Sequence, residues 1–246
     1  MKKSLFSFSF LLLGFCMLAE NPNTVTISGR VTDFKGNPID NSAVILMREN
    51  FNPASMVMTD ATGHYSMEVE KGQYIALLAM RLNEHPASME LFGIPRVSDE
   101  NLRLEFWAWN VIVDRDLTIN PRYDRLELYG FQVFEVLGAS PHLFAYVRPM
   151  SVGKYVETRN MEDISVEPKD IEFEIFSGDE KLIIRSVQSI YEYHEEGRYS
   201  TAFIIQFDKP SVTGVSYNIF RIVATHNAFG GEMGENLYFR KRVNYK

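Results

Sequence analysis

The feature that most constrains the fold is a series of short alternating segments separated by glycine-containing turns, beginning near residue 25. Along residues 25–31, Val, Ile, Gly and Val alternate with Thr, Ser and Arg, the period of two expected for a half-buried strand. Gly36-Asn37-Pro38 interrupts this segment, because glycine tolerates positive φ and proline cannot donate to a strand ladder. Residues 43–47 form an apolar run short enough to be a strand buried on both faces. This region therefore predicts consecutive short β-strands.

Two further turns follow in the same region. Asp60 offers a carboxylate to nearby backbone N–H groups and Gly63 supplies backbone freedom, so we expect a hairpin turn there. Residues 65, 67 and 69 alternate out of that turn, Gly72 turns the chain again, and residues 74–80 return as another buried strand. We expect positive φ at both Gly63 and Gly72.

Together these residues resemble the carboxypeptidase regulatory-like domain, a small prealbumin-like β-sandwich that accompanies other modules. The motifs that carry the resemblance are residues 27–39, 59–65 and 71–74, and they cover about residues 24–80. The resemblance implies a prealbumin-like sandwich, which we extend over residues 24–130. It implies no catalytic chemistry, and it says little about function because the family serves as an accessory in peptidases, receptors and surface proteins.

A second set of alternating segments fills the rest of the chain. Ile171, Phe173 and Ile175 alternate with glutamates, and turn signals at 177–179 and 195–197 separate the later segments at the spacing of a sandwich. We predict a second, immunoglobulin-like β-sandwich over residues 131–246, without the cysteine pair of antibody domains. No long stretch has helical periodicity, so the expected fold class is all-β with two β-sandwich domains.

The N-terminus has the features of an export signal. Lys2 and Lys3 precede an apolar stretch, residues 5–18, that is too short for a transmembrane helix, and we interpret residues 1–19 as a signal peptide. Cys16 offers a second interpretation, a lipobox whose cysteine is lipidated, although Phe15 stands where a small residue is usual. Either way we expect an exported protein, in the periplasm, on the outer membrane surface or outside the cell. A lipid on Cys16 would be its only contact with a membrane.

Charge and motifs exclude several functional classes. The chain has a formal net charge of −7 and lacks a basic stripe with interleaved aromatic residues, so we expect no nucleic-acid partner. No zinc-peptidase signature, P-loop or Gly-x-Ser-x-Gly motif is present. Ser151 and Lys154 match Ser-x-x-Lys, but they fall in β-rich sequence without companion motifs, and we interpret the match as chance. We therefore expect no enzyme, no metal site and no cofactor.

One pair of residues suggests a binding surface. Trp107 and Trp109 are two apart in an expected strand and so share a face with Glu105 and Arg103. Paired indoles on a sheet surface stack on sugar rings, and charged neighbours bond the hydroxyl groups. The alternative is that the tryptophans line a core or a domain interface, where large aromatic residues usually lie.

The sequence thus favours a non-catalytic bacterial protein, secreted or attached to the cell envelope, that acts as a structural or protein-interaction module. The alternative is a carbohydrate-binding module that captures glycans at the cell surface through Trp107 and Trp109. The expected partner is accordingly an envelope protein or a polysaccharide.

Overall fold

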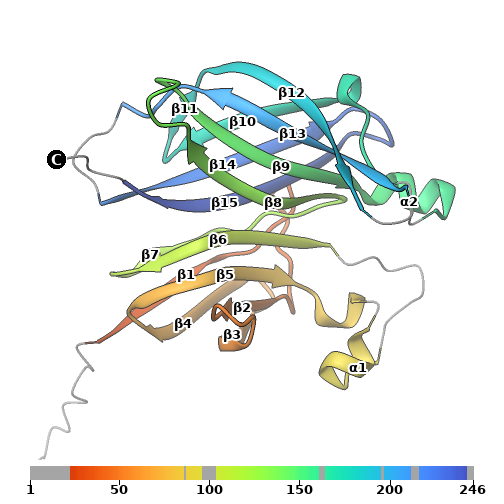
Figure 1. Ribbon diagram of the computed structural model, residues 1–246. Helices are drawn as coiled ribbons and strands as arrows, with labels where there is room; N and C mark the ends of the chain where they lie inside the picture. Colours follow the sequence, from red (N-terminus) through yellow and green to blue (C-terminus); the bar gives the residue numbers. More distant parts are fainter. Residues whose placement is uncertain are drawn as a thin grey trace, which may run out of the picture.

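The computed structural model describes residues 23–85, 87–95, 104–160, 164–194, 197–211 and 216–242 (Figure 1). The predicted signal peptide, Cys16 and Arg103 lie outside the described residues. The described chain is an all-β protein built from two β-sandwiches, which confirms the predicted fold class. Among the described residues, no helix is long and apolar enough to cross a bilayer.

The first sandwich packs a three-stranded sheet, in the order β4-β1-β7, against the four strands β3-β2-β5-β6. Its elements are β1 (Thr24–Arg30), β2 (Ala43–Met47), β3 (Pro53–Met58), β4 (His64–Glu70), β5 (Gly72–Met80), the short helices η1 (Leu82–Glu84) and α1 (Ser88–Phe92), β6 (Glu105–Val113) and β7 (Leu117–Thr118). The strand β2 is buried on both faces, as its apolar run predicts: Val44 and Leu46 enter the sandwich core, and Ala43 and Ile45 face the other way.

The second sandwich packs the four-stranded sheet β12-β13-β9-β8 against the strands β11-β10-β14-β15. Its elements are β8 (Leu126–Glu135), β9 (Leu143–Ser151), α2 (Val152–Thr158), η2 (Pro168–Asp170), β10 (Ile171–Ser177), β11 (Glu180–Leu182), β12 (Ile184–Tyr193), β13 (Tyr199–Phe207), β14 (Tyr217–His226) and β15 (Glu232–Lys241). The predicted division at residue 130 falls within β8, whose ladder partner β9 and core contacts belong to this sandwich.

A single sheet runs through both sandwiches. The strand β15 pairs in parallel with β6, with Asn236 opposite Trp107 and Tyr238 opposite Trp109, and this ladder produces an eight-stranded sheet in the order β11-β10-β14-β15-β6-β5-β2-β3. The strand β15 is thus an interior strand of this sheet, between β14 and β6. The two sandwiches are therefore joined by main-chain hydrogen bonds.

The two covering layers lie on opposite faces of this shared sheet (Figure 1). Phe239 on β15 is buried in the core under β4-β1-β7, whereas its neighbour Tyr238 packs on the core under β8 and β9. Because side chains alternate along a strand, these two neighbours mark opposite faces. Each covering layer ends near the β15–β6 junction, and this leaves a concave step on each face of the sheet.

The two glycine predictions have different outcomes. Gly63 has φ +80°, and a Cβ there would lie 2.4 Å from the carbonyl oxygen of Val31, so the predicted turn is confirmed. Gly72 does not have positive φ, and that prediction is wrong. Gly72 begins β5 and continues the ladder opposite Val113, so an extended backbone serves there.

Candidate functional site

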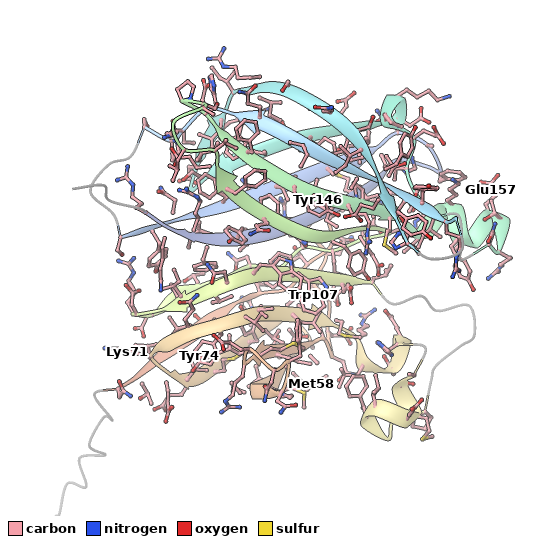
Figure 2. All side chains as sticks on the ribbon, viewed as in Figure 1. Met58, Lys71, Tyr74, Trp107, Tyr146 and Glu157 are labelled. Atoms are coloured by element: carbon pink, nitrogen blue, oxygen red, sulfur yellow. The ribbon has the colours of Figure 1, made fainter. Side chains whose placement is uncertain are left out.

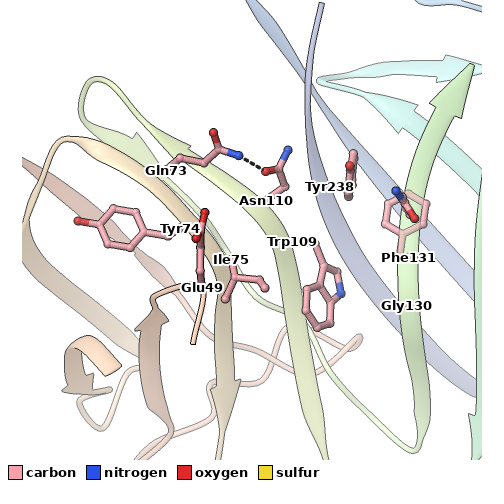
Figure 3. A pocket seen from close by; sticks show the side chains of 10 residues that line it. Glu49, Gln73, Tyr74, Ile75, Trp109, Asn110, Gly130, Phe131 and Tyr238 are labelled. Atoms are coloured by element: carbon pink, nitrogen blue, oxygen red, sulfur yellow. Dashed lines mark hydrogen bonds between the residues drawn. The ribbon is translucent and has the colours of Figure 1, made fainter. Parts of the chain in front are cut away.

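The concave step on the β8 side is the candidate site, and we call it the aromatic groove. It has a volume of about 440 Å³. Figure 3 shows the side chains that line it. Its aromatic lining comes from both sandwiches and consists of Tyr74, Trp109, Phe131 and Tyr238. Its amide side chains are Gln73, Asn110 and Gln132.

Backbone irregularities in two strands shape this groove. In β6, Asn110 has φ +54°, and the inward alternation shifts there: Phe106 and Ala108, then Val111 and Val113, all enter the same core. In β8, Gly130 has φ +64° where the β8–β9 register shifts by one residue, which is a β-bulge. A bulge bends its strand and re-aims side chains, so Phe131 and Gln132 are directed by it.

The amide groups of the groove are held by hydrogen bonds. Gln73 donates from Nε2 to Oδ1 of Asn110 at 2.5 Å, as Figure 3 shows. Asn110 in turn donates from Nδ2 to the carbonyl oxygen of Phe239 at 2.6 Å, and Lys241 donates to Oε1 of Gln73 at 2.7 Å. These bonds fix the orientation of both amides at the groove wall.

Two tyrosines that line the groove have a raised pKa. Burial, and then the charge of Glu70, raises the pKa of the Tyr74 hydroxyl above 10.0, and the charge of Arg48 opposes that rise. The second is Tyr238. Burial raises the pKa of its hydroxyl above the ordinary value of 10.0, and a hydrogen bond with Gln132 and the charge of Arg240 oppose that rise. The phenol therefore stays protonated at neutral pH and retains its O–H donor. The groove thus combines apolar ring surface with neutral hydrogen-bonding groups and one carboxylate, that of Glu49.

The two tryptophans do not form the flat surface for sugar stacking that their spacing suggested. Trp107, labelled in Figure 2, lies on the strand β6 between the two sandwiches. Trp107 and Trp109 are both partly buried and stack face to face, with ring centroids 4.7 Å apart and planes 6° from parallel. Both indole nitrogens are buried without a hydrogen-bond partner among the described residues. Trp109 lines the groove, whereas Trp107 packs on a satellite cluster around Leu78 and Met80. The pair therefore offers the groove one indole rather than two.

Of the other predicted site residues, Glu105 is not brought to the groove. Glu105 is on the same strand face but only 4% exposed, and it is not part of the groove lining. Arg103 lies outside the described residues. The residues that the sequence reasoning missed, Tyr74, Phe131 and Tyr238, come from strands distant in sequence. The available signal was Gly130, because a glycine inside an alternating strand often marks a bulge.

The Ser-x-x-Lys match falls at a helix start, contrary to our expectation of β-structure there. Ser151 is the N-cap of α2 and accepts a hydrogen bond from the backbone N–H of Lys154 at 2.9 Å. Its hydroxyl donates to the buried Glu232 carboxylate, which also contacts Nδ1 of His226 at 3.0 Å. Ser151, Glu232 and His226 are at most 1% exposed, so the cluster anchors α2 to the β14–β15 hairpin out of reach of a substrate.

The side chains of two turn aspartates, Asp33 and Asp60, form hydrogen bonds within their own loops. Asp33 accepts from the backbone N–H groups of Lys35 and Asn37, and Asp60 accepts from those of Thr62 and His64. These bonds lower the pKa of both carboxyls, that of Asp33 against the opposing effect of burial. Across the described ranges, no group of three or more His, Cys, Asp or Glu residues is placed to hold a metal ion.

The edge strand of the second sandwich is a second surface suited to binding. The strand β12 is the edge of its sheet and, within the part of the chain that the structure describes, pairs with β13 alone (Figure 1). The exposed fraction of its side chains is large for apolar residues, at 73% for Tyr191, 64% for Tyr193 and 47% for Val187. Beside β12 lies a hollow of about 440 Å³, whose lining includes Val187, Ser189, Phe173 and Phe203.

No family model and no curated protein matches the chain, so the resemblance to the carboxypeptidase regulatory-like domain stays a prediction. Three solved structures illustrate the similarity to known folds. BcpA, the major pilin subunit of Bacillus cereus, is 11% identical, with 88% of this chain and 69% of that chain covered and a TM-score of 0.27. A DUF3823 family protein from Bacteroides ovatus is 11% identical, with 87% and 98% covered and a TM-score of 0.26. The 5-hydroxyisourate hydrolase of Klebsiella pneumoniae is 22% identical, with 41% and 89% covered and a TM-score of 0.23.

Proposed function

We propose that this protein is a non-catalytic, exported interaction module of a bacterial cell envelope, and that it binds a partner protein by strand addition at β12. The observation that carries the proposal is the unpaired edge of β12 beside an apolar hollow. Long edge strands with exposed apolar side chains are templates for another chain, and proteins usually blunt them with charges, prolines or bulges. Between the bulge near Ile184 and the end of β12, no proline occurs and Glu192 is the one charged residue.

The ladder indicates which backbone groups a partner would use. His194 donates to the carbonyl oxygen of Arg198, and hydrogen-bonded pairs alternate along an antiparallel ladder. The backbone groups of Val187, Ser189 and Tyr191 therefore point away from β13 toward the free edge. A partner segment paired there would place alternate side chains over Phe173 and Phe203, which gives specificity while the main chain gives affinity.

The test uses Ser189→Pro, with Ser189→Ala as the matched control. Proline is tolerated where the N–H faces solvent on an edge strand, so we expect little change in melting temperature. It removes one donor from the edge and places its ring in the path of an added strand. Phage-displayed decapeptides selected on the wild-type protein should bind Ser189→Ala and lose binding to Ser189→Pro.

The recovered peptides should alternate apolar and polar residues, and binding should slow amide hydrogen exchange at Val187 and Tyr191. Peptides that bind the proline variant as well as the wild type would reject strand addition. Selection that recovers no specific binder would reject it too.

A second candidate function, carbohydrate binding, is favoured by the aromatic groove. Its rings offer stacking surface for the apolar face of a sugar, and the fixed amides of Gln73 and Asn110 offer polar contacts. Tyr238→Ala should remove retention on an immobilised neutral polysaccharide, because this ring is partly exposed and lines the groove. Tyr191→Ala, an equal truncation on β12, should leave retention unchanged. Equal retention by both variants would contradict glycan binding in this groove.

A further inference from the structure

The concave step on the opposite face of the shared sheet, which we call the arginine groove, has a different chemistry. It has a volume of about 650 Å³ and lies where the β1–β7 layer ends over β14 and β15. Arg30, Arg122 and Arg221 line it together with the acidic residues Asp179 and Glu235. The lining therefore carries one net positive charge, although the whole chain is at −7.

The centre of this groove is a buried carboxylate shared by two guanidinium groups. The side chain of Glu235 is 3% exposed. Its Oε2 accepts from Nε of Arg122 at 3.0 Å, from Nη2 of the same guanidinium group, and from Nη1 of Arg221 at 3.4 Å. One carboxylate neutralises one of these two cations, so a positive charge and several N–H donors are left over. Arg122 and Arg221 are 34% and 29% exposed, which leaves those donors reachable from the groove.

Both guanidinium groups are held in place by aromatic rings. The guanidinium carbon of Arg221 lies 4.0 Å from the ring centroid of Phe176, and that of Arg122 lies 4.9 Å from the centroid of Phe34. A guanidinium that is already ordered loses less conformational entropy when it binds an anion. The arrangement is therefore prepared for a further planar anion.

The other lining residues indicate which further groups a ligand of this groove should carry. Thr32, Thr118 and Asn120 place hydroxyl and amide groups along one wall, and Ile219 and Leu237 give an apolar floor. The Oδ1 of Asn120 accepts from the backbone N–H of Arg30, so its NH₂ group is directed elsewhere as a donor. Such walls match a ring that has hydroxyl groups on its rim and an apolar face.

We propose that the arginine groove binds a carboxylate-bearing, hydroxylated ligand of the sugar-acid class, with the carboxylate on Arg122 and Arg221. Planar guanidinium forks pair with carboxylates in two parallel hydrogen bonds. A single net positive charge suits a monoanion better than a doubly charged phosphate. The site is independent of strand addition at β12.

The experiment is a titration of the full protein with D-glucuronate, with D-glucose as the uncharged match, followed by the NMR signals of the arginine Nε–H groups. Glucuronate should shift the signals of Arg122 and Arg221 saturably, and glucose should not. Arg221→Gln should raise the Kd at least about tenfold, because it removes charged hydrogen bonds. Arg185→Gln, which removes an exposed arginine paired with Asp208, should leave the Kd unchanged.

Arg30→Gln is the second variant if Arg221→Gln does not give a folded spectrum, and it should also weaken binding. Ser189→Pro should bind glucuronate normally, so a failure at β12 is separable from a failure here. Equal shifts with glucose would overturn the proposal. So would tighter binding of inorganic phosphate, or of tri-alanine through its terminal carboxylate.

Discussion

The two grooves at the junction lie on opposite faces of the same sheet and have opposite chemistry. The aromatic groove is lined by rings and amides and lies under the bulge of β8. The arginine groove is lined by three arginines, two of which share one buried carboxylate, and it lies beside β7. Both grooves exist because the two halves of one continuous sheet are covered on opposite faces. The architecture produces the two grooves. The side chains on β6, β8, β14 and β15 determine which ligand chemistry each groove can bind.

The largest effect is expected from Phe239→Ala, which should disturb both grooves at once. Phe239 is fully buried on β15, the strand that joins the sandwiches, and the main chain at this residue also holds Asn110. Loss of a buried phenyl ring should lower the free energy of unfolding by about 3–5 kcal/mol. Urea unfolding measures this, with Tyr191→Ala as the exposed control, expected within about 0.5 kcal/mol of wild type. A change below about 1 kcal/mol would show that β15 is not packed as described.

Glu235→Gln should affect the arginine groove alone. It removes the buried carboxylate and leaves Arg122 and Arg221 without their partner, which should cost about 2 kcal/mol, less than for fully buried pairs because both arginines are partly exposed. The freed guanidinium groups should also bind glucuronate more tightly than in the wild type. Thermal melting and titration measure the two effects. A more stable variant with weaker glucuronate binding would contradict the shared-carboxylate geometry.

Substitution of one glycine in each groove allows a direct comparison of the two. Gly130 of the aromatic groove and Gly178 of the arginine groove both have positive φ, at +64° and +60°. A Cβ at Gly130 would lie 2.9 Å from the Tyr146 ring, whereas at Gly178 nothing lies within 4 Å. Gly178→Ala should therefore show the backbone strain alone, about 1 kcal/mol, and Gly130→Ala should lose about 1 kcal/mol more. Equal losses by denaturant unfolding would mean that the β8 bulge does not press on β9.

The smallest effect concerns pH. Burial raises the pKa of Tyr238 in the folded protein above its unfolded value near 10. The stability that the protonated Tyr238 hydroxyl contributes is therefore fully present below pH 10. It is lost as the pH rises through the pKa of this hydroxyl in the folded protein. Tyr238→Phe should reduce the decline of unfolding free energy between pH 9 and pH 11 slightly, with Tyr191→Phe as control. A steeper decline in Tyr238→Phe would reverse the assigned sign.

The sequence predicts the local structure well because turns and alternation are local. The strand β2 is buried on both faces and the turn at Gly63 has positive φ, both as their residue types indicate. These features depend on contacts within a few residues, for which glycine conformation and side-chain period are sufficient.

The junction could not be predicted in the same way. The pairing of Trp107 with Asn236 joins residues far apart in the chain, and no alternation pattern specifies which strand lies beside which. The shift of alternation at Asn110 also escaped the sequence reasoning, since asparagine adopts positive φ without a distinctive pattern around it. The tryptophan pair was identified from its spacing, but its stacking and the burial of Glu105 depend on neighbours that come from other strands.

The two sandwiches share one sheet and should therefore unfold together. Both tryptophans of the chain are on β6, and Trp109 also packs on the core of the second sandwich. In Trp109→Phe the fluorescence of Trp107, which packs on Leu78 and Met80, therefore reports the first sandwich. A dye on Ser186→Cys in a Cys16→Ser background reports the edge strand of the second sandwich. Equilibrium urea unfolding followed by both probes should give one transition with the same midpoint and slope. Two separated midpoints would show that the β15–β6 ladder does not couple the sandwiches, and would contradict the account.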